Sequence, residues 1–218
     1  MKRQHLVVTA GVVILAAFLL GAYVYKRQAA VQVVLPTKEV TAALVRFHSP
    51  TYGAADAKVD LVEFFDPACE TCRKFYPLVK EIVDSSGGKV RLVLRYAAFH
   101  KGSDEAIKIL EAARKQSKYW PAVEAALAAQ PEWASHSRPQ PELLWNYLGR
   151  IGLDVERAKN DVRDPRITAI IEQDQADLVA MNVRATPSFI VNGKPLSDFG
   201  IDQLKALVQR EVDSAYPK

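Results

Sequence analysis

The sequence predicts an α/β fold that is interrupted by a long helical block. Two apolar runs, Val59–Phe65 and Val90–Tyr96, are typical of buried strands, and a helical pattern over residues 69–84 separates them. A strand–helix–strand order with a helix on the crossover indicates a parallel pair of strands. The periodicity is then purely helical over residues 101–182, until a further strand-like run begins at residues 188–191. An α/β sheet with a helical insertion is therefore the simplest assembly.

An uncharged apolar stretch, residues 6–25, lies near the start of the chain. A helix of that length spans the hydrocarbon core of a bilayer. The stretch exceeds the apolar core of a signal peptide, and no convincing small-residue cleavage site follows it. We therefore expect residues 1–27 to form an uncleaved N-terminal transmembrane signal anchor, with a cleaved signal peptide as the alternative. The basic residues that flank the stretch are Lys2, Arg3, Lys26 and Arg27.

Those four basic residues account for the whole formal net charge of +4. The remainder, residues 28–218, carries 25 basic and 25 acidic side chains, so no nucleic-acid-binding surface is expected. The chain has two cysteines, closely spaced, which suits an exported protein whose single disulfide is functional. We expect a single-pass protein of the bacterial inner (cytoplasmic) membrane, whose C-terminal domain faces the periplasm or exterior.

Residues 28–50 are expected to form a tether. They contain a short amphipathic stretch, residues 40–47, and the sequence leaves open whether it packs on the following domain or against a second copy. The sheet domain is expected from residues 51–100 and 183–218, with residues 101–182 as the inserted helical domain.

Local signals place the remaining elements. Asp164-Pro165 is a good N-cap and first-turn pair for a helix. Asn192-Gly193 predicts a hairpin turn after the strand-like run. The other predicted elements are helices near residues 103–116, 119–129, 143–151 and 167–181, a return strand near 194–196, and a closing amphipathic helix near 201–212.

Both cysteines stand in the tetrapeptide Cys69-Glu70-Thr71-Cys72, where a strand gives way to a helix. A helix N-terminus stabilises a thiolate. Positions i and i+3 share a helix face, and their backbones come near enough for a disulfide. The tetrapeptide therefore predicts a redox-active dithiol that opens and closes without dismantling the fold.

Two other interpretations of the cysteine pair are a structural disulfide and half of a zinc site. So short a loop constrains the unfolded chain little, which disfavours the first. The sequence has no second CxxC and no His-x3-His pair to complete a tetrahedral site, which disfavours the second. We expect neither a metal nor another cofactor.

Over residues 48–215 the sequence resembles the DsbA branch of the thioredoxin superfamily, in its membrane-anchored members. The core of the resemblance is the segment 62–72, in which Cys69 and Cys72 match the family's nucleophilic and resolving cysteines. The helical block also lies where this branch inserts its helical domain. The resemblance implies a thioredoxin-like fold and thiol–disulfide exchange.

Three further positions carry the resemblance. Glu63, on the predicted strand, matches the buried acid beneath the family's active site. Pro77 matches the proline that kinks the active-site helix, and Thr186-Pro187 matches the cis-proline loop that faces the dithiol. An exposed strand residue is the alternative interpretation of Glu63.

The sequence departs from the family inside the motif. The family commonly has proline after the first cysteine and often histidine before the second, where this chain has Glu70 and Thr71. Because Glu70 brings negative charge, we expect a higher Cys69 pKa and a lower reduction potential than in the most oxidising relatives. The threonine that precedes Pro187 is a feature in which the chain resembles the isomerases and reductases of the superfamily. Oxidase, reductase and isomerase therefore all stay open.

The expected roles follow from these positions. Cys69 attacks as a solvent-accessible thiolate, and Cys72 resolves the mixed disulfide. Glu63 accepts the proton that the resolving thiol loses. Pro187 removes a backbone donor near the sulfurs, and Thr186 pairs through its backbone with an extended substrate peptide.

Four neighbours complete the candidate site. Glu70 and Thr71 are expected to contact the substrate, while Asp66 and Arg73 flank the dithiol and tune it. His48 and His100 are expected to be surface or capping residues. No metal ligand is expected among them.

The predicted function is a membrane-tethered thiol–disulfide oxidoreductase that exchanges disulfides with exported proteins. It would need a membrane redox partner to recycle the dithiol, and an isomerase would benefit from a homo-oligomer. The alternatives are a non-catalytic thioredoxin-fold chaperone or scaffold in an envelope assembly apparatus, and copper(I) delivery. The lack of a Met-rich or His-rich tract disfavours copper delivery.

Overall fold

The computed structural model describes Phe18 and residues 43–217. Residues Pro36–Lys218 form one compact unit, distinct from residues Met1–Leu35. The predicted signal anchor, apart from Phe18, and most of the predicted tether lie outside the described residues. Among the residues that are described, no helix is long and apolar enough to cross a membrane.

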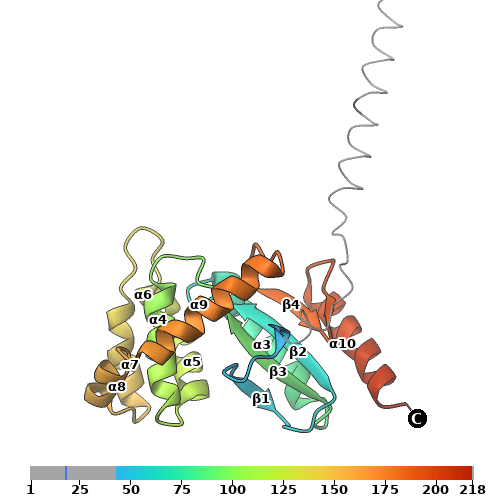
Figure 1. Cartoon of the computed structure of the whole chain (residues 1–218), viewed down its shortest axis with the longest axis horizontal. Helices are drawn as coiled ribbons and strands as arrows, with labels where there is room; N and C mark the ends of the chain where they lie inside the picture. Colours follow the sequence, from blue (N-terminus) through green and yellow to red (C-terminus); the bar gives the residue numbers. More distant parts are fainter. Residues whose placement is uncertain (1–17, 19–42, 218) are drawn as a thin grey trace, which may run out of the picture. The chain divides into compact units, whose positions relative to one another are not determined.

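A five-stranded mixed sheet forms the centre of the larger unit (Figure 1). Its strands, in spatial order, are β1 (Thr51–Gly53), β3 (Val90–Tyr96), β2 (Val59–Phe65), β4 (Ser188–Val191) and β5 (Lys194–Pro195). The β2–β3 pair is parallel, as the sequence predicts, and the other pairs are antiparallel. The mixed α/β, thioredoxin-like fold is therefore confirmed.

Strand β1 was not predicted, because three residues are too few to show an alternating pattern. Gly53 adopts φ +110°, and a Cβ there would lie 2.8 Å from Val83 and 2.9 Å from the Val90 carbonyl. Only glycine therefore lets this edge strand approach β3 so closely.

Helices connect and cover the strands. They are α3 (Glu70–Asp84), α4 (Ser103–Arg114), α5 (Tyr119–Ala128), α6 (Gln130–Trp133), the 3-10 helix η1 (Pro141–Leu143), α7 (Leu144–Arg150), α8 (Val155–Asp161), α9 (Pro165–Ala180) and α10 (Ile201–Ala215). Asp164 caps α9 as predicted, with its Oδ1 accepting from the Arg166 amide at 3.0 Å. The short helix α6 was missed, since it is not long enough to show helical periodicity.

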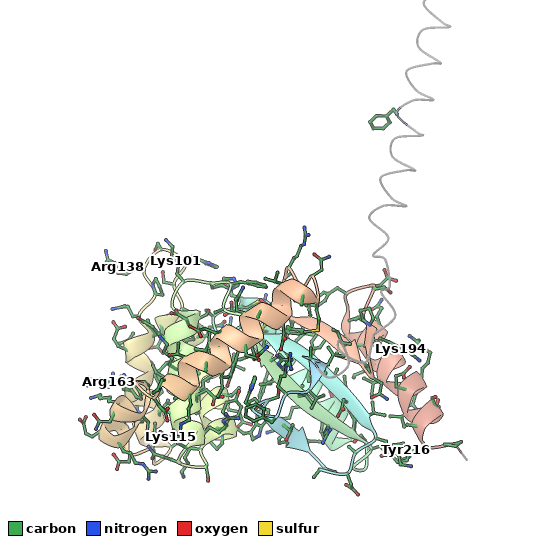
Figure 2. The ribbon with its side chains drawn as sticks, in the orientation of Figure 1. Lys101, Lys115, Arg138, Arg163, Lys194 and Tyr216 are labelled. Atoms are coloured by element: carbon green, nitrogen blue, oxygen red, sulfur yellow. The ribbon has the colours of Figure 1, made fainter. Side chains whose placement is uncertain are left out.

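The helical block α4–α9 packs on itself and on the sheet. Lys115, at the end of α4, binds Asp161 at 2.6 Å and Asp164 at 3.0 Å, at the outer end of the block (Figure 2). Apolar side chains of the block belong to the same buried cluster as those of α3 and the sheet. The boundaries 101–182 for a separate helical domain stay a prediction.

Side chains of β2 alternate between two cores. Leu61 and Phe65 pack with α3 and α10, whereas Val62 and Phe64 pack with Leu178 of α9, which passes in front of the sheet in Figure 1. The Glu63 side chain shares the strand face of Leu61 and Phe65, because the three residues are spaced two apart along β2. It therefore lies on the face that α3 covers, beneath the helix that carries the dithiol.

A buried ion cluster holds α9 against the sheet. The Arg95 side chain, on β3, is fully buried, and its Nη2 donates to Asp174 at 2.7 Å and to Asp177 at 2.5 Å. Asp174 also accepts from the Tyr96 amide at 2.7 Å. These partners satisfy charges that would be costly to bury alone.

The same cluster binds the end of the predicted tether. Arg95 donates to the Ala43 carbonyl, and His48 Nε2 lies 2.7 Å from Asp174 Oδ1. His48 is 5% exposed, so the expected surface position is wrong: its partner is a carboxylate from a distant helix. Of the stretch 40–47, Ala43 and Leu44 are buried against their own domain, whereas Phe47 is exposed.

Replacing Arg95 tests how much this ion cluster contributes to the stability of the fold. Arg95→Met removes the buried cation from Asp174 and leaves Asp177 only the partly exposed Arg46, so we expect a loss of about 3–5 kcal/mol in unfolding free energy, measured by urea denaturation. Arg91→Met is the matched control, because Arg91 lies on the same strand and its pair with Asp60 is partly exposed. That variant should lose no more than about 1 kcal/mol. Equal losses in the two variants would contradict the account.

Candidate functional site

Cys69 is the N-cap of α3, so its sulfur lies at the start of the helix. Its amide donates to the Asp66 carbonyl at 3.1 Å, and its carbonyl accepts from the Arg73 amide at 3.1 Å. Cys69 is only 5% exposed, which is less than the solvent access that the sequence suggested. Cys72, one turn into the helix, is fully buried. Both cysteines are free thiols in this structure.

The Thr186-Pro187 loop lies opposite the first cysteine. The Cys69 thiol donates to the Thr186 carbonyl at 3.3 Å. The Thr186-Pro187 peptide bond is cis, as the resemblance implied, and Pro187 is buried. Because proline has no N–H, this loop brings a carbonyl to the sulfur without a competing backbone donor.

Glu63 lies in the protein interior and is not an exposed strand residue. The residue is fully buried, and within the described part of the chain neither carboxylate oxygen has a hydrogen-bond partner. Burial raises the pKa of Glu63 to about 8, and the negative charge of the Cys69 thiolate adds to the rise. A carboxyl group with such a pKa exchanges protons near neutral pH.

The surroundings of the two thiols shift their pKa values in opposite directions. A hydrogen bond with the Cys72 side chain lowers the pKa of Cys69 to about 5; burial opposes this, while the Thr186 side chain and the amides of Cys72 and Thr71 assist it. Burial raises the pKa of Cys72 well above its ordinary value, and the hydrogen bond to Cys69 and the negative charge of Glu63 raise it further. At neutral pH the pair therefore holds one thiolate, on Cys69.

Glu70 does not act on this thiolate as the sequence suggested. Its side chain is 63% exposed and its carboxylate lies 4.0 Å from His136 Nε2, and its charge is not a principal cause of the Cys69 pKa. Exposure screens the repulsion. The pKa of about 5 still lies above the value of roughly 3.5 in the most oxidising relatives. Thr71 is half-buried and contributes its amide.

Asp66 anchors the loop that precedes the dithiol. Its buried carboxylate accepts from the Ala68 amide at 2.9 Å, the Phe99 amide at 2.9 Å and the His100 amide at 3.0 Å. His100 Nδ1 lies 2.7 Å from Asp66 Oδ2, and Ser103 donates its hydroxyl to Asp66. The sequence singled out Asp66 only as a flanking charge, since its partners come from the loop after β3.

Gln130, at the start of α6, was missed by the sequence analysis. Its Nε2 donates to the Pro67 carbonyl at 2.8 Å and to the Cys69 carbonyl at 3.0 Å. A glutamine in an alanine-rich helical segment carries no signal for this contact. The helical block therefore reaches the dithiol directly.

Comparison with known proteins identifies one fold family. The family model described as Thioredoxin matches residues 47–210. Among curated proteins, the chain is 31% identical over 144 residues to a Na(+)/H(+) antiporter NhaA of Herminiimonas arsenicoxydans, covering 66% of this chain and 22% of that protein. It is 28% identical over 177 residues to disulfide bond formation protein D of Bacillus subtilis, covering 75% of this chain and 77% of that protein. The chain thus spans less than a quarter of the first of these relatives.

Solved structures agree with this result. A thioredoxin-like oxidoreductase from Silicibacter pomeroyi is 30% identical with a TM-score of 0.68, covering 78% of this chain and 96% of that one. BdbD from Bacillus subtilis is 25% identical with a TM-score of 0.67, covering 82% and 96%. Wolbachia pipientis α-DsbA1, at 16% identity and a TM-score of 0.70, covers 81% and 97% and shares the fold.

The pKa of Glu63 makes stability depend on pH. Because the unfolded carboxyl ionises near 4.5 and the folded one near 8, the native state is increasingly penalised as pH rises between these values. Glu63→Gln removes the penalty, so its advantage over the parent should grow by about 1.4 kcal/mol per pH unit. Urea unfolding of the reduced proteins at pH 5, 6 and 7 measures this difference.

Repeating the comparison in a Cys69→Ser background separates the effect of burial on the Glu63 pKa from the effect of the Cys69 thiolate charge. The slope should persist there, since burial is the main cause of the raised pKa. A difference between Glu63→Gln and its parent that does not change with pH would contradict the assignment.

Proposed function

This chain belongs to the thioredoxin family as a DsbA-like thiol–disulfide oxidoreductase, and from that premise we propose that Cys69 and Cys72 exchange disulfides with exported proteins. The observation that carries the proposal is that the two thiols lie in different environments, which give them different pKa values. Cys69 stands at a helix start with a pKa of about 5, while Cys72 is buried one turn deeper with a raised pKa.

In the oxidising direction, a substrate thiolate attacks Cys69 of the Cys69–Cys72 disulfide. The intramolecular S–S bond breaks, a mixed disulfide with Cys69 forms, and Cys72 leaves and takes a proton. A second substrate thiolate then attacks the substrate sulfur of the mixed disulfide and releases Cys69 as a thiolate. The substrate loses two electrons, which the reduced dithiol passes to a membrane redox partner.

Glu63 is proposed as the group that exchanges the Cys72 proton. It lies on the sheet face beneath α3, and its pKa of about 8 suits proton transfer at neutral pH. Pro187 and Thr186 are proposed to hold the substrate backbone beside Cys69, and Glu70 and Thr71 to contact it from the helix start. The contact between the Cys69 sulfur and the Thr186 carbonyl supports this placement.

The thiolate pKa bears on the direction of electron flow. A stabilised thiolate favours the reduced dithiol and makes the disulfide a better oxidant. With a Cys69 pKa of about 5, we propose that the protein donates disulfides, as an oxidase or isomerase. Isomerase activity would be consistent with a homo-oligomer assembled through residues 28–42.

The proposed location is the bacterial cell envelope. Residues 6–25 are apolar and flanked by basic residues, and disulfide exchange needs an oxidising compartment. We propose that residues 1–27 anchor the chain in the inner membrane and that residues 28–42 lead to a domain on the periplasmic side.

Trapping the mixed disulfide tests the proposal. Cys72→Ala removes the resolving thiol, so Cys69 should stay bound to substrate thiols, and higher-mass species sensitive to dithiothreitol should accumulate on non-reducing gels. Mass spectrometry of the bands should place the bond on Cys69. Exported proteins with several cysteines should predominate among the partners.

Cys69→Ala is the matched control, because it leaves Cys72 buried and should trap nothing. If neither variant traps a partner, and both support growth like the parent, the non-catalytic chaperone or scaffold function takes the place of the enzyme.

A further inference from the structure

The buried thiol Cys72 carries negative charge during one step of the exchange. When a thiolate attacks the Cys69 sulfur of the disulfide, the S–S bond breaks and its electron pair stays on Cys72. Cys72 is fully buried, so water does not solvate the new thiolate. A buried charge without a hydrogen-bond donor is costly. The rate of this step therefore depends on a donor that faces the Cys72 sulfur.

The peptide group that joins Phe65 to Asp66, at the end of β2, supplies such a donor. Its carbonyl, on Phe65, accepts from the Ala97 amide at 2.9 Å. The group is trans, so its N–H, on Asp66, points away from Ala97. Burial raises the pKa of Cys72, and among the principal influences on that pKa only a hydrogen bond from the Asp66 backbone lowers it. This N–H therefore favours the charged form of the leaving thiol.

The side chain of the same residue, Asp66, holds that peptide group in place. One carboxylate oxygen accepts from the Ala68 amide and the Ser103 hydroxyl, and the other accepts from the Phe99 and His100 amides. These contacts fix residue 66 both to the turn before the dithiol and to the loop after β3. The partners are backbone amides and a hydroxyl, so the carboxylate acts on the dithiol through the backbone.

We propose that Asp66 is a positioning residue for the step in which Cys72 leaves: its carboxylate holds the Asp66 N–H toward the Cys72 sulfur, and that N–H stabilises the thiolate until Glu63 protonates it. This inference rests on the proposed function. An external thiolate forms a mixed disulfide with Cys69, the electron pair of the broken S–S bond goes to Cys72, and Glu63 gives up its proton to the Cys72 sulfur. The Cys69 thiolate has other hydrogen bonds, from the Cys72 side chain, Thr186 and the start of α3.

Two reactions at neutral pH separate the departure of Cys72 from the attack by Cys69. In the first, dithiothreitol reduces the oxidised protein: one of its thiolates attacks Cys69, Cys72 leaves, and its second thiolate releases Cys69. The protein gains the two electrons that dithiothreitol loses. In the second, reduced Cys72→Ala protein attacks the aromatic disulfide DTNB, whose own thiolate leaves. Only the first reaction needs Cys72 as a leaving group.

Asp66→Asn keeps the size of the side chain but replaces one acceptor oxygen with an NH2 group. Whichever way the new amide points, that group faces the Ala68 amide or the Phe99 and His100 amides, so the contacts that hold residue 66 are broken. The rate constant of the first reaction should fall about tenfold, as expected when a hydrogen bond to a charged group is lost. The rate constant of the second, measured in the Cys72→Ala background, should stay that of Cys72→Ala alone.

Asp60→Asn is the matched control, because Asp60 lies on the same strand and its pair with Arg91 is partly exposed. It should change neither rate constant. Ser103→Ala removes one donor from the Asp66 carboxylate and should slow the first reaction alone, about threefold, so it serves as the test if Asp66→Asn does not fold. Slowing of both reactions, or of neither, would overturn the inference and leave the proposed function intact. If the oxidised parent protein does not oxidise dithiothreitol, the proposed function itself fails.

Discussion

The chemistry of the site depends on a difference in environment between two otherwise identical thiols. The start of a single helix creates that difference. Cys69 is the N-cap residue of α3, where backbone amides and the Cys72 side chain stabilise negative charge on its sulfur, while Cys72 lies one turn deeper and fully buried. Sheet register completes the arrangement. Glu63 on β2 pairs with Phe189 on β4, two residues after Pro187, so the sheet holds the buried acid next to the strand that the Thr186-Pro187 loop leads into.

The helical block contributes to this geometry and is more than a cover for the sheet. Gln130 of α6 binds the backbone at Cys69, and the loop leading into α4 binds Asp66 through His100 and Ser103. The active-site loop is thus held from two elements of the block. A change that loosens the block should alter the reactivity of the dithiol as well as stability, because the same hydrogen bonds serve both.

The sequence predicted those parts of the fold that carry a local signal. Strands Val59–Phe65 and Val90–Tyr96 were predicted with their observed bounds, since a short, largely apolar run is typical of a buried strand. The helix start at Cys69 followed from the onset of helical periodicity, whereas the burial of Glu63 was implied by the family resemblance. The contact between Gln130 and Cys69 spans 61 residues, and that between Arg95 and Asp177 spans 82. Such pairings arise only from tertiary packing, so no pattern in a single sequence could reveal them.

The reduction potential of the Cys69–Cys72 pair, equilibrated against glutathione, tests the central claim most directly. Each tenfold change in thiolate stability shifts a two-electron couple by about 30 mV. Scaling from thioredoxin (about −270 mV, pKa about 7) and from DsbA (about −120 mV, pKa about 3.5) to the Cys69 pKa of about 5 brackets the expected value. We predict a potential between about −210 and −165 mV. A value near −270 mV, or a pair that does not exchange with glutathione, would contradict a stabilised Cys69 thiolate as the basis of function.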